Sequence, residues 1–165
     1  MTSDNFFKQL GTSTVVYDYF HDNKLSDQPY TIDLKGFDAL LLDLNIVLQE
    51  PVLNLINNQH EIEYGFFLKL KPKMWYNWHV DTGRLCTINM LVSNTQKSHS
   101  LFKTGNHVSV KQHEVIELEY QPKQMYLYNT SIEHAVVNLE NTDRFIFSLA
   151  FKHEPAYNDI LNLIK

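Results

Sequence analysis

The first sixty residues carry hydrophobic positions at the spacing of helices. Between residues 36 and 48 the apolar side chains recur every three or four positions, which places them on one face of a predicted helix that ends before Pro51. A second short helix is predicted over residues 52–57, because Pro is tolerated in a first helical turn. We expect these helices to support one face of a sheet. Residues 1–35 show no distinct motif.

From residue 61 onward the pattern changes to that of strands. Short runs rich in Phe, Tyr, Ile and Val are separated by turn-forming residues. The predicted strands are residues 62–70, 74–81, 85–92, 107–110, 115–120, 124–128, 133–138 and 144–151. About eight short strands in roughly 90 residues predict a sandwich or barrel, of which a jelly roll is one common form. Residues 155–164 are expected to form a terminal helix over one edge.

Length and composition favour one domain. The 165 residues are 44% hydrophobic and 13% aromatic, which is enough for one packed core and too little for two ordinary domains. We therefore expect a single domain over residues 1–165. Residues 1–60 would form helical and strand support, residues 61–151 the core of the sheet structure, and residues 152–165 the C-terminal helix.

The distribution of charge argues against nucleic acid and membranes as partners. The net charge is −5, and the Lys and Arg residues are scattered rather than clustered as phosphate binding requires. The N-terminus has no basic segment followed by an apolar stretch, and 18 apolar residues never run together. The single Cys86 cannot form an internal disulfide. We expect a cytoplasmic protein.

The residues that suggest chemistry begin with a His-x-Asp motif. His79 and Asp81 lie two apart on a predicted strand, so both side chains should point to one face. His134 lies on a distant predicted strand that a closed sheet could bring alongside. Two imidazoles and a carboxylate suit iron(II) and leave three coordination positions open. Trp75 and Asn77 share the parity of His79 and are the expected pocket-lining residues.

A buried arginine is the second chemical feature. Arg144 follows His134 by ten residues and opens an apolar strand, on which alternation places Ser148 on the same face. A guanidinium binds a carboxylate bidentately, and its burial in such a strand calls for an anion. The distal carboxylate of 2-oxoglutarate would serve. The rival explanation is a salt bridge from Arg144 to Asp143 or Glu140.

The order and spacing of His79-x-Asp81, His134 and Arg144 resemble the double-stranded β-helix Fe(II)/2-oxoglutarate oxygenases, over roughly residues 62–151. Within that family the chain is similar to the aspartyl/asparaginyl β-hydroxylase-like group, including bacterial hydroxylases of free proline. These share an Arg ten residues after the distal His. The group often has a further Arg on the strand after the first His. Here only Arg84 is nearby, and it is the candidate for that place.

The resemblance implies a mainly β, cupin-like jelly roll with N-terminal helices against one sheet and a short C-terminal helix. It implies an enzyme that uses iron(II), 2-oxoglutarate and molecular oxygen. Its small-molecule or peptide substrate would be an amino acid or an Asp, Asn or Pro residue, hydroxylated with release of succinate and carbon dioxide. The implied site residues are His79, Asp81 and His134 for the metal, and Arg144, Arg84 and Ser148 for the cosubstrate.

Two other functions fit part of the same pattern. One is a cupin-like metal-binding module that is catalytically inactive or not an oxygenase. The other is a zinc or manganese enzyme of the wider cupin class, which His and Asp ligands also permit. The presence of both Asp81 and Arg144 favours the oxygenase, because neither alternative needs the two together.

Overall fold

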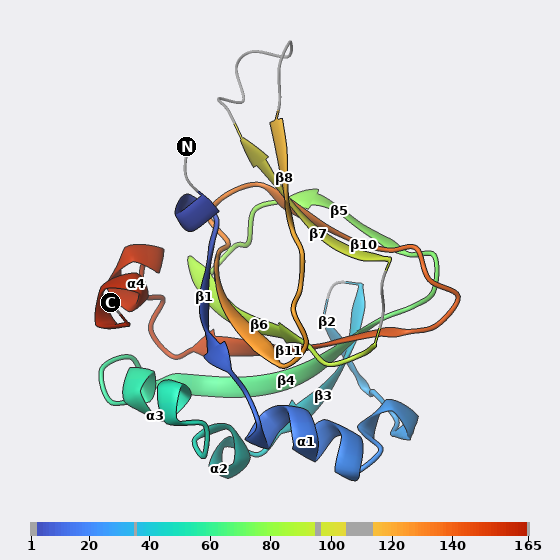
Figure 1. Ribbon diagram of the computed structural model, residues 1–165, viewed down its shortest axis with the longest axis horizontal. Helices are drawn as coiled ribbons and strands as arrows, with labels where there is room; N and C mark the ends of the chain where they lie inside the picture. The colour runs from blue at the N-terminus through green and yellow to red at the C-terminus, as the bar shows by residue number, and fades with distance from the viewer. Residues whose placement is uncertain (1–2, 35, 95–96, 105–113, 165) are drawn as a thin grey trace.

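The computed structural model describes residues 3–34, 36–94, 97–104 and 114–164, which form a jelly roll of two antiparallel sheets (Figure 1). Within these residues the larger sheet has seven strands in the order β1-β9-β6-β11-β4-β3-β2. The smaller sheet has four, in the order β5-β10-β7-β8. This arrangement confirms the predicted fold class, which is mainly β with helices at one face and one edge.

The larger sheet consists of β1 (Phe7–Thr12), β9 (Gln124–Asn129), β6 (Cys86–Leu91), β11 (Arg144–Phe151), β4 (Ile62–Leu70), β3 (Phe37–Leu42) and β2 (Ile32–Leu34). The smaller sheet consists of β5 (Trp75–His79), β10 (His134–Asn138), β7 (Ser98–Thr104) and β8 (Glu114–Leu118). Helices α1 (Val15–Asp22), α2 (Leu44–Val47) and α3 (Pro51–Asn57) lie against the outer face of the larger sheet, and α4 (Tyr157–Leu163) lies at its edge (Figure 1). The short 3-10 helices are Ser3–Asn5 and Leu25–Asp27.

The main hydrophobic core lies between the larger sheet and the helices. Phe67 of β4 packs between Phe20 of α1 and Phe147 of β11, with ring centroids 5.0 and 6.0 Å away. Strand β11 is buried on both faces, but its two faces differ. Phe145, Phe147 and Leu149 face this core, whereas the alternate residues from Arg144 to Ala150 line a cavity between the sheets. The inner face of the larger sheet is therefore available for a site.

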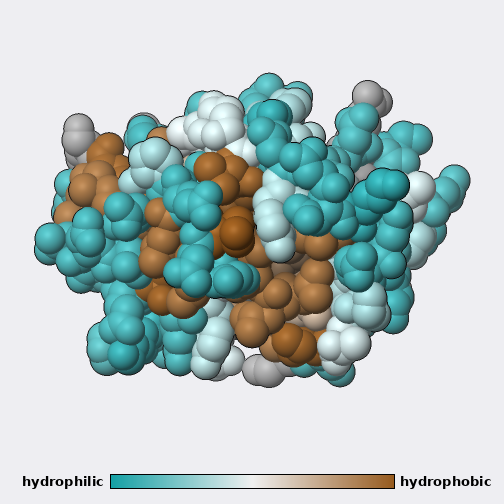
Figure 2. Space-filling view, turned by 90° about the horizontal axis from the view of Figure 1, so that it is seen from below, coloured by the Kyte–Doolittle hydropathy of each residue, from teal (hydrophilic) through white to brown (hydrophobic). Residues whose placement is uncertain are grey.

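The face that carries the N-terminal helices shows hydrophobic surface between hydrophilic side chains (Figure 2). A buried carboxylate ties these helices together. Glu50, which precedes α3 and is 1% exposed, accepts hydrogen bonds from the Val16 backbone N–H at 2.9 Å and from the Ser13 hydroxyl. It thereby caps α1, whose own N-cap residue makes no side-chain cap. Among the described helices, none is long and apolar enough to cross a membrane.

Most predicted elements are confirmed with shifts of one or two residues. The confirmed strands are 62–70, 85–92, 115–120, 124–128, 133–138 and 144–151, and the confirmed helices are 52–57 and 155–164. The predicted strand 74–81 ends earlier, at His79. The predicted strand 107–110 lies outside the described residues. Strand β7 was not predicted, because its inward side chains include the polar Ser98, Ser100 and Thr104.

The helix predicted over residues 36–48 is wrong. The first half of this segment is strand β3, which pairs with β2 on one side and β4 on the other. Helix α2 begins only after Asp43, whose side chain accepts a hydrogen bond from the Asn45 backbone N–H at 2.8 Å. The apolar spacing fits either structure, and pairing within the sheet decides between them. Strands β1 and β2 likewise pair residues 7–12 and 32–34 into the larger sheet.

Gly65 should be essential to the packing of α2 on β4. A Cβ at this position would lie 2.8 Å from Val47 Cγ2 and 3.4 Å from Phe147 Cε2. We expect Gly65→Ala to lower the free energy of unfolding by about 1 to 3 kcal/mol, measured by urea denaturation. In a Val47→Ala background, which removes the nearer methyl group, the same substitution should cost less. An equal cost in both backgrounds would contradict the steric explanation.

Candidate metal centre and adjoining pocket

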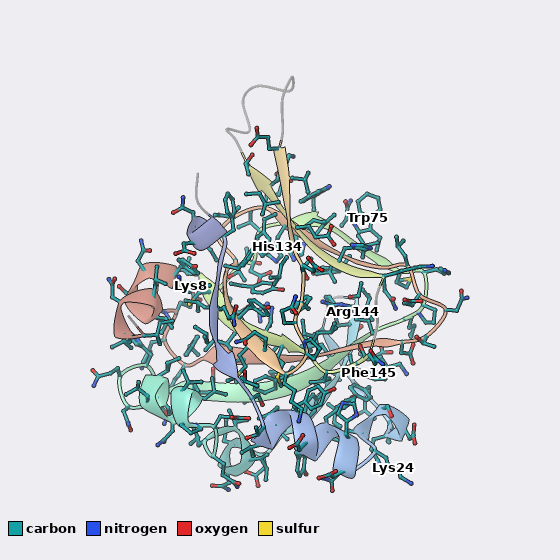
Figure 3. All side chains as sticks on the ribbon, in the orientation of Figure 1. Lys8, Lys24, Trp75, His134, Arg144 and Phe145 are labelled. Atoms are coloured by element: carbon teal, nitrogen blue, oxygen red, sulfur yellow. The ribbon has the colours of Figure 1, made fainter. Side chains whose placement is uncertain are left out.

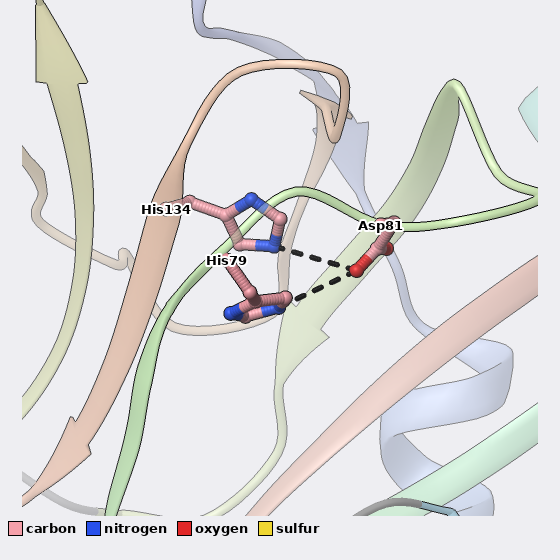
Figure 4. Close-up of side chains that lie close together, drawn as sticks. All are labelled: His79, Asp81 and His134. Atoms are coloured by element: carbon pink, nitrogen blue, oxygen red, sulfur yellow. Dashed lines mark ion pairs between the residues drawn. The ribbon is translucent and has the colours of Figure 1, made fainter. Parts of the chain in front are cut away.

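The structure brings together the three side chains that the sequence suggested as metal ligands (Figure 4). His79 and His134 lie opposite each other where β5 pairs with β10. Asp81 Oδ1 lies 3.3 Å from His79 Nε2 and 3.8 Å from His134 Nε2. The three possible ligand atoms all lie within 4.8 Å of one another, so they could hold one ion.

Asp81 reaches this point from a different backbone position than predicted. Strand β5 ends at His79, so Asp81 is not on the strand, and strand alternation is not the reason that the two side chains meet. Instead, the Asp81 backbone N–H donates to the Thr130 carbonyl at 3.1 Å. This bond fastens the chain after β5 to the turn before β10.

Hydrogen bonds on the far side of each imidazole orient the two histidines. His79 Nδ1 lies 2.6 Å from the Asn77 carbonyl oxygen, and His134 Nδ1 lies 2.8 Å from that of Ile132. A carbonyl only accepts, so each Nδ1 carries the hydrogen and the Nε2 of a neutral ring presents its lone pair. Both lone pairs and a carboxylate oxygen thus face a common point. Such an arrangement suits a cation.

The protonation states also favour a cation. Burial lowers the pKa of His134. Burial acts to raise the pKa of Asp81, but its contact with His79 and the positive charge of Arg84 outweigh that effect and lower the pKa to about 2. At neutral pH, His134 is therefore neutral and Asp81 is an anion. These are the forms that bind a divalent metal.

The three side chains line a cavity of about 660 Å³ between the two sheets. Arg144, at the start of β11, lines the same cavity and lies with His134 between the sheets (Figure 3). Its side chain is among the most deeply buried in the described chain, at 1% exposure. The cavity volume falls within the range that small-molecule sites occupy.

Neutral hydroxyl groups surround the Arg144 guanidinium. Its Nε donates to Ser98 Oγ, and its Nη2 donates to Ser100 Oγ at 3.3 Å and to the Tyr120 hydroxyl at 3.4 Å. The guanidinium also lies 5.7 Å from the centroid of the Tyr120 ring. Hydroxyls and an aromatic ring orient the group without neutralising its charge.

The salt bridge considered as a rival explanation for Arg144 is not present. Asp143 pairs with Lys69 at 3.1 Å, and Glu140 accepts from the Lys97 backbone N–H at 3.1 Å. Among the described residues, no carboxylate lies within ion-pair distance of Arg144. A buried cation without an anion is costly. Arg144 is thus placed to receive the anionic group of a ligand in the cavity.

Arg84 and Ser148 lie together at another part of this cavity. Arg84 donates to Asp81 Oδ2 through Nε at 2.8 Å and through Nη2 at 2.6 Å, which leaves Oδ1 to the histidines. Its Nη1 donates to Ser148 Oγ at 3.4 Å. The Ser148 hydroxyl also lies 3.3 Å from Thr87 Oγ1. Arg84 therefore holds the carboxylate of the His-Asp-His cluster.

Among the polar side chains that line or adjoin this cavity and were not predicted from the sequence, four bear on ligand binding. Three are the hydroxyl partners of Arg144. The fourth is Asn89 of β6, whose Oδ1 is buried and has no hydrogen-bond partner among the described residues. The alternation of Ser98, Ser100 and Phe102 on β7 was the available signal, since small polar residues at inward positions indicate a polar pocket.

The expectation that Trp75 and Asn77 line the pocket is wrong. Both are exposed, Trp75 points away from the barrel interior (Figure 3), and Tyr76 lines the cavity instead. A bulge between β5 and β10 is the cause. His79 faces His134, but Tyr76 faces the residue two positions further along β10, so three steps on β5 match two on its partner.

No protein-family model matches the chain, and no curated protein matches its sequence. Solved structures do match its fold. HygX from Streptomyces hygroscopicus, solved with nickel, 2-oxoglutarate and hygromycin B bound, aligns with a TM-score of 0.64 and 11% identity over 92% of this chain and 84% of that chain. The viral collagen prolyl hydroxylase vCPH from Paramecium Bursaria Chlorella virus-1 aligns with a TM-score of 0.60 and 8% identity, over 91% of this chain and 97% of that chain. A prolyl-4-hydroxylase from Pseudomonas putida aligns with a TM-score of 0.57 and 13% identity, over 90% of this chain and 93% of that chain.

These similarities show that the chain shares its fold with oxygenases, prolyl hydroxylases among them. The jelly roll and a His-Asp-His cluster within it agree with the resemblance seen in the sequence. Similarity to the aspartyl/asparaginyl β-hydroxylase-like group within that family stays a prediction.

Metal binding by the cluster can be tested through thermal unfolding with nickel(II). At about a hundredfold excess over the dissociation constant, a bound ion should stabilise the fold by about 2.7 kcal/mol. We expect this gain for the wild-type protein and for His99→Ala, a control at a histidine paired with Glu117 away from the cluster. His134→Ala should lose it. An equal gain in both variants would show that the ion binds elsewhere.

Arg144 should destabilise the folded protein when no ligand is bound. We expect Arg144→Met to leave the free energy of unfolding of the ligand-free protein unchanged or to raise it by up to about 2 kcal/mol, because it removes an unpaired buried charge. Denaturant unfolding measures the effect. A loss of several kcal/mol would mean that the hydroxyl groups alone compensate the charge and that no anion is needed.

Proposed function

We propose that the chain is an iron(II)- and 2-oxoglutarate-dependent dioxygenase that hydroxylates a C–H bond of its substrate and releases succinate and carbon dioxide. One observation carries the proposal. A cluster of two imidazole nitrogens and a carboxylate oxygen shares a cavity with a buried arginine that has no carboxylate partner in the described chain. The family resemblance in the sequence and the fold of the neighbours support it.

The donor set fits iron(II). His79, Asp81 and His134 would supply two neutral nitrogens and one anionic oxygen, and three ligands on one side leave room for a chelating cosubstrate and oxygen. Arg84 fixes the carboxylate by holding its second oxygen. The two backbone carbonyls behind the imidazoles fix the rings. The protein's own contribution at the metal is therefore orientation.

The cavity also fits 2-oxoglutarate. Arg144 would hold the carboxylate distal to the metal through a paired hydrogen bond. The hydroxyls of Ser100 and Tyr120 lie near enough to the guanidinium to turn and share that carboxylate. Iron and 2-oxoglutarate, when bound, would supply the chemistry that activates oxygen. Ser148 and Arg84, on the same cavity wall, are candidates to contact the cosubstrate nearer to the metal.

A metal-binding module without turnover, and a zinc or manganese enzyme, would need the ligand cluster alone. Neither explains why Arg144 is buried among hydroxyls at the cost of an unpaired charge. A 2-oxoglutarate-dependent enzyme does, because its cosubstrate carries a carboxylate at each end. We also propose that residues 1–165 act as a single domain, since β1, β2 and β3 pair into the same sheet as the later strands.

Formation of succinate tests the proposal. With iron(II), 2-oxoglutarate and oxygen we expect slow succinate production by the wild-type protein and none above background by His134→Ala. Arg144→Ala should raise the KM for 2-oxoglutarate by about 30-fold or more, because a buried charge pair is worth at least about 2 kcal/mol.

His99→Ala is the matched control and should behave as the wild type. Two results would contradict the proposal. One is a KM for 2-oxoglutarate that Arg144→Ala leaves unchanged. The other is an iron(II)-loaded wild-type protein that makes no succinate from 2-oxoglutarate and oxygen.

A further inference from the structure

Part of the inner face of the larger sheet forms an apolar wall in the cavity that the His-Asp-His cluster also lines, and we define this wall as Leu34 of β2, Phe37 of β3, and Tyr64, Phe66 and Leu68 of β4. All five line the cavity. Leu34 pairs directly with Phe37, and alternate residues of β4 share a face. The wall is therefore one surface built from three adjacent strands.

The apolar wall is accessible to an entering molecule. Strands β4, β3 and β2 form one end of the larger sheet, and Leu34 and Tyr64 remain 38% and 43% exposed. The hairpin of β2 and β3 is held in place by Phe37, whose ring packs on Tyr76 of β5 at 4.8 Å between centroids. Apolar side chains left open beside a polar site indicate contact with another molecule.

The charged groups of the cavity all have other partners. Among the described residues, Asp81 is the one acid that lines it. One oxygen of Asp81 is held by Arg84, and the other faces His79 and His134. Under the proposed function, Arg144 is occupied by the cosubstrate. The described lining thus offers no carboxylate for the ammonium group of a free amino acid.

The apolar wall is open, whereas the charged groups of the cavity have other partners. We therefore infer that the substrate is an uncharged small molecule with an apolar, ring-containing body. This body would pack on the apolar wall and present a C–H bond to the His-Asp-His cluster. The inference rests on the proposed function. Burying an unpaired charge is costly, whereas aromatic side chains such as Phe66 and Tyr64 favour ring-shaped partners. Among the substrates that the sequence suggested, a free amino acid and an aspartate side chain fit this cavity poorly.

The reaction balances without a further reactant. One C–H bond of the substrate becomes C–O–H with an oxygen atom from O₂, and the second oxygen atom enters the carboxylate of succinate. The cosubstrate gives up carbon dioxide and the two electrons that complete the reduction of O₂. The reaction therefore requires no charged group on the substrate.

The test uses N-phenyl-1-naphthylamine, an uncharged aromatic probe whose fluorescence rises in apolar surroundings. It is titrated into protein loaded with zinc(II), as a redox-inert substitute, and 2-oxoglutarate. Leu34→Asp and Tyr64→Asp place a charge on the apolar wall at partly exposed positions, where the fold should tolerate it. Leu55→Asp is the matched control, because Leu55 is 52% exposed on α3 and does not line the cavity.

We expect the wild type and Leu55→Asp to bind the probe equally, and both wall variants to bind it about tenfold more weakly or worse. Free proline, asparagine and aspartate should not displace it. Equal binding by all four proteins would overturn the inference, and so would displacement by a free amino acid. Displacement by an end-blocked proline peptide that also stimulates succinate formation would overturn it in favour of a peptide substrate.

Failure of this inference can be told from failure of the proposed function. If the inference alone is wrong, the wild-type protein forms succinate but probe binding does not depend on the wall. If the proposed function is wrong, no succinate forms, whatever the probe does.

Discussion

The pairing of β5 with β10 is the constraint on which the rest of the site depends. It sets His79 opposite His134, and the bulge beside that pair turns Tyr76 inward while the chain runs on to Asp81. Each imidazole is then fixed by a carbonyl of its own chain two residues earlier, so little else is needed to aim both Nε2 atoms at one point. A change of register would separate the cluster and leave a buried carboxylate beside Arg84.

The second organising feature is the unpaired charge of Arg144. The strand that carries it is apolar on the face toward the helices, so the fold keeps Arg144 buried whatever the cavity holds. Hydroxyls from β7 and from Tyr120 orient the guanidinium without cancelling its charge. Such a site gives up stability in return for affinity toward an anion. Under the proposed function, the polar groups around Arg144 would hold the cosubstrate and the apolar wall would hold the substrate, within one cavity.

The sequence was sufficient where local pattern and tertiary environment agree. Strands such as β4 and β11 could be predicted because alternation and β-branched or aromatic residues coincide. The sequence was insufficient where strand partners distant in the sequence decide the secondary structure. The segment of β3 has the apolar spacing of a helix, and β7 is too polar to be predicted as a strand. The residues that could hold the metal followed from chemistry and spacing. The surroundings of Arg144 did not, because they come from one other strand, β7, and from the segment after β8.

The central claim is that one cavity holds iron(II) and 2-oxoglutarate together. Anaerobic titration of both into the purified protein tests it directly, by the weak visible metal-to-ligand charge-transfer band of such a complex. The band should appear with the wild-type protein, be lost with His134→Ala and be weakened with Arg144→Ala. A folded, iron-loaded protein that gives no band when 2-oxoglutarate is added would contradict it.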